Sequence, residues 1–137
     1  MSDTNSSLPL AGIRVLDLSR VLAGPMCGMA LGDFGAEVIK VEHPSRGDDT
    51  RDWGLRVGAN RNKQSITLDL QKPEAVQIVL DLARQCDVVI QNFKFGGAEK
   101  IGLGYEQIKA VRPDIIYCSI SGYDRSGPEA ARPGYDL

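Results

Sequence analysis

The stretch that decides the fold is IRVLDLSRVLAGPMCGMALGDFGAEVIKV, residues 13–41. It begins with a run of mostly apolar side chains, residues 13–18, that Gly12 and Ser19 bound on either side. A short apolar run between turn residues is typical of a buried β-strand. We therefore expect the first strand of the protein at residues 13–18.

A helix and a second strand complete this stretch. Pro25 suits the first position of a helix, because proline lacks the N–H group that the first turn leaves unpaired. Apolar residues then recur at helical spacing up to Phe34, and Gly35 is a typical helix stop. Residues 38–41 again have the short apolar pattern of a strand. A β-α-β unit of this kind closes right-handed, with its two strands parallel.

The alternation of strands and helices continues to the end of the chain. Further strands are predicted at residues 65–70, 88–90 and 115–120, and helices at residues 72–83 and 105–111. Residues 43–64 have no period and many charges, which predicts a long surface loop. Strands that alternate with helices predict an open parallel α/β sheet.

The composition indicates one ordinary domain of 137 residues, 42% hydrophobic and 25% charged. Cys27, Cys86 and Cys118 form no CxxC pair and are interpreted as small buried hydrophobes, and with one histidine the sequence predicts no metal site. The balance of 16 basic and 18 acidic residues gives no nucleic-acid signature. Residues 1–8 form a polar leader without signal-peptide features, and no apolar run suits a membrane span, so we expect a cytoplasmic protein.

Loops at the ends of the predicted strands are the candidate binding elements. An open parallel sheet binds ligands beyond the carboxyl ends of its strands, where the strand order reverses. Three loops fit, at residues 20–25, 92–97 and 122–136. Each combines glycine with polar or basic side chains, and the first leads into a helix N-terminus, which attracts anions such as phosphate. Glycines after strands also serve to turn the chain, and neither GxGxxG nor GxxxxGK[ST] is present.

Single side chains in the loops leave two interpretations open. His43 follows the second strand and suits a ligand contact, although a lone histidine in a polar loop is commonly a solvated side chain. Trp53 and Tyr123 suit stacking on an adenine or covering an acyl chain, and equally packing on the core of their own loops. No two carboxylates, and no carboxylate and histidine, stand at a spacing that indicates an acid–base pair.

Several longer blocks of sequence, each different from the others, follow one another in a fixed order along the chain. They are residues 8–25, 32–42, 60–70, 87–93, 119–123, 127–128 and 133–136. Together they resemble the N-terminal part of the class III CoA-transferases, the CaiB/BaiF family. The resemblance implies an open parallel, Rossmann-like CoA-binding domain over residues 9–137. It also implies acyl-CoA and carboxylic acid substrates, no permanently bound cofactor, no nucleic-acid or membrane partner, and an interlocked homodimer in the full-length form.

The family's CoA contacts are carried over residue by residue. They fall on Leu22, Ala23, His43, Leu68, Asp69, Leu70, Gln71, Asn92, Phe93, Lys94, Lys100, Pro133, Gly134, Tyr135 and Asp136. His43 and Lys100 stand where formyl-CoA transferase has arginines, and lysine keeps the charge without the planar fork of arginine. Leu22 stands where that enzyme has a glutamine near the reacting centre. We therefore expect an acyl group larger or more apolar than formate or oxalate.

The resemblance also implies the chemistry. In these transferases an aspartate attacks the acyl-CoA, forms a mixed anhydride and then an aspartyl-CoA thioester, from which the acceptor acid takes the CoA. That aspartate lies in a Gly-Asp motif expected beyond Leu137, so residues 9–137 are predicted to contain no catalytic residue and to be inactive alone.

Two alternatives remain open. Racemase relatives carry a histidine base where this chain has Tyr135, and a tyrosine is a poor base near neutral pH. An α-methylacyl-CoA racemase is therefore the alternative enzyme. A non-catalytic CoA- or nucleotide-binding module is the alternative of another class.

Overall fold

The computed structural model describes residues 8–52 and 58–134, and its centre is a five-stranded sheet. The strand order is β3-β2-β1-β4-β5, and every neighbouring pair is parallel. The strands are β1 (Arg14–Asp17), β2 (Glu37–Glu42), β3 (Lys63–Thr67), β4 (Val88–Gln91) and β5 (Ile116–Ser119). The open parallel α/β sheet predicted from the sequence is confirmed.

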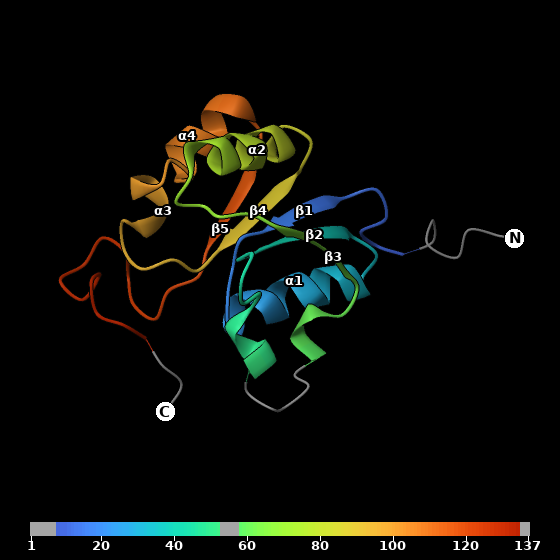
Figure 1. Ribbon diagram of the computed structural model, residues 1–137, viewed down its shortest axis with the longest axis horizontal. Helices are drawn as coiled ribbons and strands as arrows, with labels where there is room; N and C mark the ends of the chain where they lie inside the picture. The colour runs from blue at the N-terminus through green and yellow to red at the C-terminus, as the bar shows by residue number, and fades with distance from the viewer. Residues whose placement is uncertain (1–7, 53–57, 135–137) are drawn as a thin grey trace, which may run out of the picture.

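Helices cover both faces of the sheet. Helix α1 (Ala23–Asp33) lies on one face, and α2 (Pro73–Ala83), α3 (Gly97–Lys100) and α4 (Tyr105–Val111) lie on the other (Figure 1). The chain runs from β1 outward to β2 and β3, and then returns to place β4 on the other side of β1. The strand order therefore reverses between β1 and β4, which is where folds of this kind bind ligands.

The hydrophobic core has two parts, one on each face of the sheet. Val15 and Leu16 are neighbours in β1, and their side chains belong to different core clusters because successive strand residues face opposite sides. Leu16 packs with Val79 of α2 and Ile108 of α4, all fully buried. Val15 packs on the other face, where Leu31 of α1 covers it. The core thus fixes the helices and leaves the strand ends to the loops.

Several element boundaries differ from the prediction. Helix α1 begins at Ala23, two residues before Pro25. Strand β3 covers Lys63–Thr67 instead of residues 65–70, because Asp69 starts a turn in which its carbonyl accepts the N–H of Lys72 at 2.9 Å. The short helix α3 had no counterpart in the prediction, since four residues give too little periodicity to recognise.

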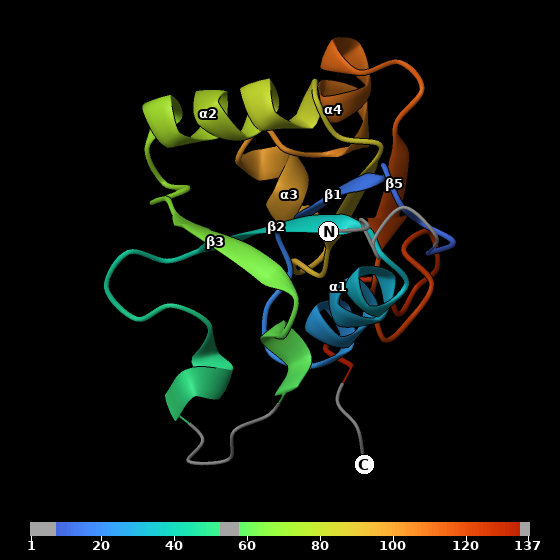
Figure 2. The same cartoon turned by 90° about the vertical axis from the view of Figure 1, so that its right-hand side faces the viewer.

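The prediction of a long surface loop between β2 and β3 is confirmed only in part, because most of its described residues are exposed or half-buried and a few are internal. The segment contains two 3₁₀ helices, η2 (Asp49–Asp52) and η3 (Gly58–Asn60), which lie on the α1 side of the sheet (Figure 2). Asp48, Thr50 and Ala59 are buried, at 5% exposure or less. The charges that suggested a solvated loop are partly internal, because the sheet supplies partners for them.

The cysteines are free, and one of them is fully buried. Burial raises the pKa of the Cys86 thiol to about 11, so this thiol stays protonated at neutral pH. Cys27 and Cys118 are only half-buried. The interpretation as buried small hydrophobes is therefore confirmed for Cys86 and only partly for the other two.

Candidate functional site

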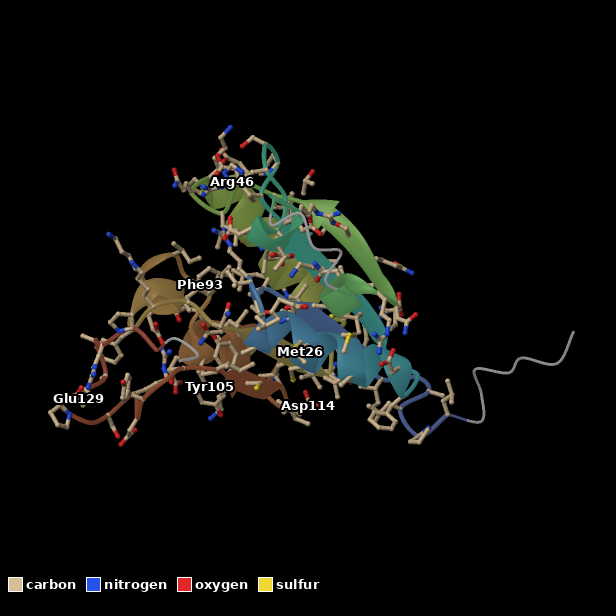
Figure 3. The ribbon with its side chains drawn as sticks, turned by 90° about the horizontal axis from the view of Figure 1, so that it is seen from below. Met26, Arg46, Phe93, Tyr105, Asp114 and Glu129 are labelled. Atoms are coloured by element: carbon tan, nitrogen blue, oxygen red, sulfur yellow. The ribbon has the colours of Figure 1, made fainter. Side chains whose placement is uncertain are left out.

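The predicted contact residues gather at one edge of the molecule. Because all five strands are parallel, the loops that follow them meet at the carboxyl edge of the sheet. In the view of Figure 3, Phe93 of the loop after β4 lies between Arg46 of the loop after β2 and Glu129 of the loop after β5. Predicted contacts follow each strand: Leu22 and Ala23 after β1, His43 after β2, residues 68–71 after β3, 92–94 after β4, and 133–134 after β5.

Three predicted residues lie outside the residues that the structure describes. They are Trp53, Tyr135 and Asp136. The roles expected for them remain predictions.

A pocket of about 330 Å³ lies between the start of α2 and the end of α3. It is lined by Leu70, Gln71, Pro73, Val76, Gln77, Leu80, Lys100 and Ile101. Leu70, Gln71 and Lys100 are predicted CoA contacts, which two distant segments of the chain bring to one cavity. Lys100 adds an exposed ammonium group to walls that are aliphatic with two amides.

The side chain of Asn92 joins the two loops at the point where the strand order reverses. Its Oδ1 accepts the N–H of Arg20 at 2.8 Å, and its Nδ2 donates to the carbonyl of Arg20 at 2.7 Å. The family resemblance implies that Asn92 contacts the ligand. In the structure its amide holds the main chain of the neighbouring loop, and its contact to a ligand stays a prediction.

His43 begins a tight turn after β2. The N–H of Gly47 donates to the carbonyl of His43 at 2.9 Å and closes the turn. The ring Nδ1 accepts the N–H of Ser45 at 3.3 Å and lies 3.0 Å from the Ser45 hydroxyl. Because Nδ1 accepts this bond, the neutral ring carries its proton on Nε2. The Nε2–H group is therefore the one available to a ligand.

A cluster of four buried charges lies beneath the loop between β1 and α1. Its members are Asp17, Lys40, Asp48 and Lys63, whose side chains are at most 2% exposed. Nζ of Lys40 lies 2.8 Å from Oδ2 of Asp48 and 4.0 Å from Oδ2 of Asp17, and Nζ of Lys63 lies 2.8 Å from the same Asp17 oxygen. Two positive and two negative groups balance, which makes burial of the cluster tolerable.

The sequence carries a signal for this cluster that hydrophobic periodicity alone does not register. Asp17 and Lys40 each interrupt an apolar strand, and a charge inside a buried strand needs a partner. The register of β1 and β2 places these two residues opposite each other. Gly28 of α1 lets the helix close on them, since a Cβ there would lie 2.7 Å from Oδ2 of Asp17.

Ion pairing sets the ionisation of two carboxylates in this region. Burial alone raises the pKa of Asp48, but hydrogen bonds from Lys40 and Thr50 outweigh it and leave the pKa below its ordinary value. Burial likewise opposes ionisation of Glu42, and Arg51 reverses it through bonds of 3.0 and 2.6 Å, so the pKa of Glu42 is also lowered. Both carboxylates are therefore charged at neutral pH.

The loop after β5 folds back on itself. A Cβ placed on Gly122 would lie 2.3 Å from Cα of Gly134, so only glycine allows the two backbones to touch. This contact returns Pro133 and Gly134 to the carboxyl end of β5. Within the loop, the Arg132 guanidinium lies 5.0 Å from the centre of the Tyr123 ring. Tyr123 therefore packs within its own loop, one of its two predicted roles.

Two general features concern the described residues only. None of their helices combines the length and the apolarity that crossing a bilayer demands. Within residues 8–52 and 58–134, no three His, Cys, Asp or Glu side chains converge as metal ligands do.

The geometry agrees with the comparison with known proteins. The model of CoA-transferase family III matches residues 10–137. The succinyl-CoA:glutarate CoA-transferase of Mus musculus is 51% identical over 144 residues, which cover 98% of this chain and 33% of the relative. The succinate–glutarate CoA-transferase of Agrobacterium fabrum is 48% identical over 147 residues, 96% of this chain and 37% of the relative.

A solved structure gives the same result. A CAIB/BAIF family protein from Brucella suis superposes with a TM-score of 0.87 at 48% identity, over 94% of this chain and 37% of that one. The chain spans about a third of the length of the curated relatives it matches. On this evidence the chain belongs to CoA-transferase family III.

Proposed function

We propose that this chain is the CoA-binding N-terminal part of a transferase that moves CoA from an acyl-CoA thioester to a carboxylic acid. The observation that carries the proposal is the convergence of Leu70, Gln71 and Lys100 on one pocket beside the carboxyl edge of the sheet. Family membership makes CoA the expected ligand. The named relatives exchange CoA between succinyl and glutarate groups, so the proposed substrates are succinyl-CoA and a dicarboxylic acid such as glutarate.

The proposed ligand path follows the carboxyl edge of the sheet. The aliphatic pocket receives the nucleotide end of CoA, with the Lys100 ammonium attracting its phosphates. The thioester end extends to Leu22 and Ala23, where α1 begins. Leu22 provides no side-chain cap, so N–H groups of the first helical turn remain for the ligand. An apolar Leu22 at this end also favours an acyl chain longer than formate.

The covalent step is proposed to belong to an aspartate beyond Leu137. Its carboxylate attacks the acyl carbon and CoA thiolate leaves; the thiolate then attacks the aspartyl carbonyl and releases the donor acid as a carboxylate. The acceptor carboxylate next attacks the aspartyl thioester, and the returning thiolate cleaves the new anhydride. The present chain supplies binding and orientation for these steps. The same proposal includes a cytoplasmic, interlocked homodimer for the full-length protein, without membrane or nucleic-acid partners.

Charge reversal in the pocket tests the binding proposal. Calorimetric titration with CoA compares the wild-type chain, Lys100→Glu and the control Lys109→Glu, an exposed lysine on α4. Lys100→Glu is expected to weaken CoA binding at least tenfold, because one attractive charge becomes repulsive. The control changes net charge equally and is expected to stay within twofold. Equal effects of both substitutions contradict the pocket assignment.

The activity is tested on the full-length protein. Exchange of labelled glutarate into glutaryl-CoA in the presence of succinyl-CoA is the expected result. Deuterium entry at the α-carbon of a methyl-branched acyl-CoA without exchange indicates the racemase instead. The 137-residue chain alone is expected to show neither reaction.

A further inference from the structure

Val21 has a backbone conformation that its side chain disfavours. Its φ is 70°, in the left-handed region, where Cβ crowds the following carbonyl and β-branched residues are rarest. Among the described residues the other non-glycine residue with positive φ is Asn62, and asparagine tolerates this region. The conformation of Val21 must therefore be imposed by its surroundings.

The surroundings hold every residue of the short loop from Ser19 to Val21. Nζ of Lys40 donates to the carbonyl of Ser19 at 2.9 Å. Asn92 bonds to both the N–H and the carbonyl of Arg20, the middle residue. Oδ1 of Asp48 accepts the N–H of Val21 at 3.3 Å. Three side chains thus hold the loop, one from β2, one from the segment after β2 and one from the loop after β4.

Asp48 is the centre of this arrangement. Besides Val21, its Oδ1 accepts the N–H and the hydroxyl of Thr50, both at 3.0 Å. Its Oδ2 lies 2.8 Å from Nζ of Lys40, the group that also holds Ser19. The Asp48 side chain is buried, so these bonds are made in the absence of competing water. Asp48 therefore connects the segment between β2 and β3 to both ends of the loop.

We infer that Asp48 is a positioning residue for the acyl end of the CoA site. By holding the Val21 N–H it fixes the left-handed conformation of Val21, and this sets the direction in which the chain enters Leu22 and helix α1. What the loop binds rests on the proposed function, whereas the conformational role of Asp48 rests on the contacts above. Asp48 acts without touching the ligand.

Two measurements on the same variants test this inference. In NMR spectra, a left-handed residue gives a strong intraresidue HN–Hα NOE, and calorimetry measures CoA affinity. Wild type is expected to show the strong NOE at Val21. Asp48→Asn is expected to lose it and to bind CoA about tenfold more weakly. The exposed control Asp114→Asn is expected to change neither.

Rescue by glycine separates positioning from a general structural role. Glycine adopts a positive φ without strain, so Val21→Gly makes the loop independent of Asp48. The double variant Asp48→Asn with Val21→Gly is expected to bind CoA within about threefold of wild type. If Asp48→Asn does not fold, Val21→Pro replaces it: proline forbids the positive φ and removes the N–H while the buried charges stay paired. Val21→Pro is expected to bind CoA at least tenfold more weakly.

The possible failures are distinguishable. If Asp48→Asn binds CoA as tightly as wild type, the inference is overturned and the proposed function stands. The same holds for Val21→Pro if it is used because Asp48→Asn does not fold. Absence of rescue by Val21→Gly also overturns it, because Asp48 then acts by another route. A wild-type chain that shows the NOE and does not bind CoA overturns the proposed function, and the positioning role with it.

Discussion

Asn92 holds the main chain of Arg20 from 72 residues away in the sequence, accepting its N–H at 2.8 Å and donating to its carbonyl at 2.7 Å. The two residues follow β4 and β1, the strands between which the sheet order reverses. The loops after β1 and β4 lead to opposite faces of the sheet (Figure 1), and this pair of bonds keeps the two loops together. The two loops of the candidate site that follow β1 and β4 are therefore held together by hydrogen bonds.

Removing the Asn92 amide should weaken the fold as well as the site. Asn92→Ala leaves two main-chain groups of Arg20 without their partners, and we expect the free energy of unfolding to fall by about 1–3 kcal/mol. Urea denaturation measures the loss. Gln107→Ala, at an exposed position on α4, is the control and should change stability by less than about 0.5 kcal/mol. Equal stability of both variants excludes a structural role for the Asn92 bonds.

The buried charge cluster predicts an asymmetry between internal and surface ion pairs. Lys40→Met leaves Asp48 without its ion-pair partner, whereas Asp17 keeps Lys63. The cluster then holds one uncompensated negative charge, and we expect a loss of about 3–5 kcal/mol in unfolding free energy. Arg61→Ala breaks an exposed pair with Asp33 and should cost far less than the buried substitution, because water screens the exposed charges. Chemical denaturation of both variants makes the comparison. Similar losses in the two contradict the burial of the cluster.

Acid should destabilise the protein through Glu42 and Asp48. Both have a lowered pKa in the folded state, so the unfolded chain binds more protons on acidification. Their stabilisation is complete above the unfolded values and is lost as pH falls through the folded ones. Thermal unfolding should therefore show a steeper loss of stability for wild type than for Glu42→Gln between about pH 5 and pH 3. Parallel curves rule out the contribution of Glu42.

The glycine contact after β5 predicts a local effect. Gly134→Ala places a Cβ 2.4 Å from Cα of Gly122, so one backbone must move, whereas Gly127→Ala meets its nearest atom at 3.6 Å. Gly134→Ala is expected to speed hydrogen exchange in residues 120–134 and to weaken CoA binding about fivefold. Gly127→Ala serves as the control with neither effect. Unchanged exchange in Gly134→Ala is the outcome that refutes the contact.

Much of the fold was predictable because its signals are local. The run at residues 13–18 is mostly apolar and places apolar side chains on both faces, as a strand covered on both faces requires, and β1 lies within it. The helix after Pro25 and the strand after Gly35 follow equally local rules. In the surface segment 43–64 the prediction missed the buried Asp48, because its charge was counted as solvated.

The loops of the candidate site were predictable from residue patterns, whereas most of its individual contact residues were predictable only through the resemblance. Glycines and polar residues after strands indicate loops, but no local pattern indicates that Leu70 and Lys100 share a pocket. The resemblance assigns Asn92 to a ligand, and its contact to Arg20 cannot be read from neighbours in the sequence. The left-handed Val21 was missed for the same reason, since valine ordinarily avoids this conformation.

The sequence by itself determined the parallel α/β architecture and the family, because hydrophobic period, turn residues and ordered motif blocks are properties of consecutive residues. Only the tertiary structure decided which charges are internal. Asp17 meets Lys40 because β1 and β2 pair in that register, and Lys63 reaches Asp17 from β3, on the far side of β2. Burial of these charges is tolerable only where all four, two positive and two negative, are brought together. The strand order brings them together, and through them it shapes the loop at the proposed CoA site, which no local motif does.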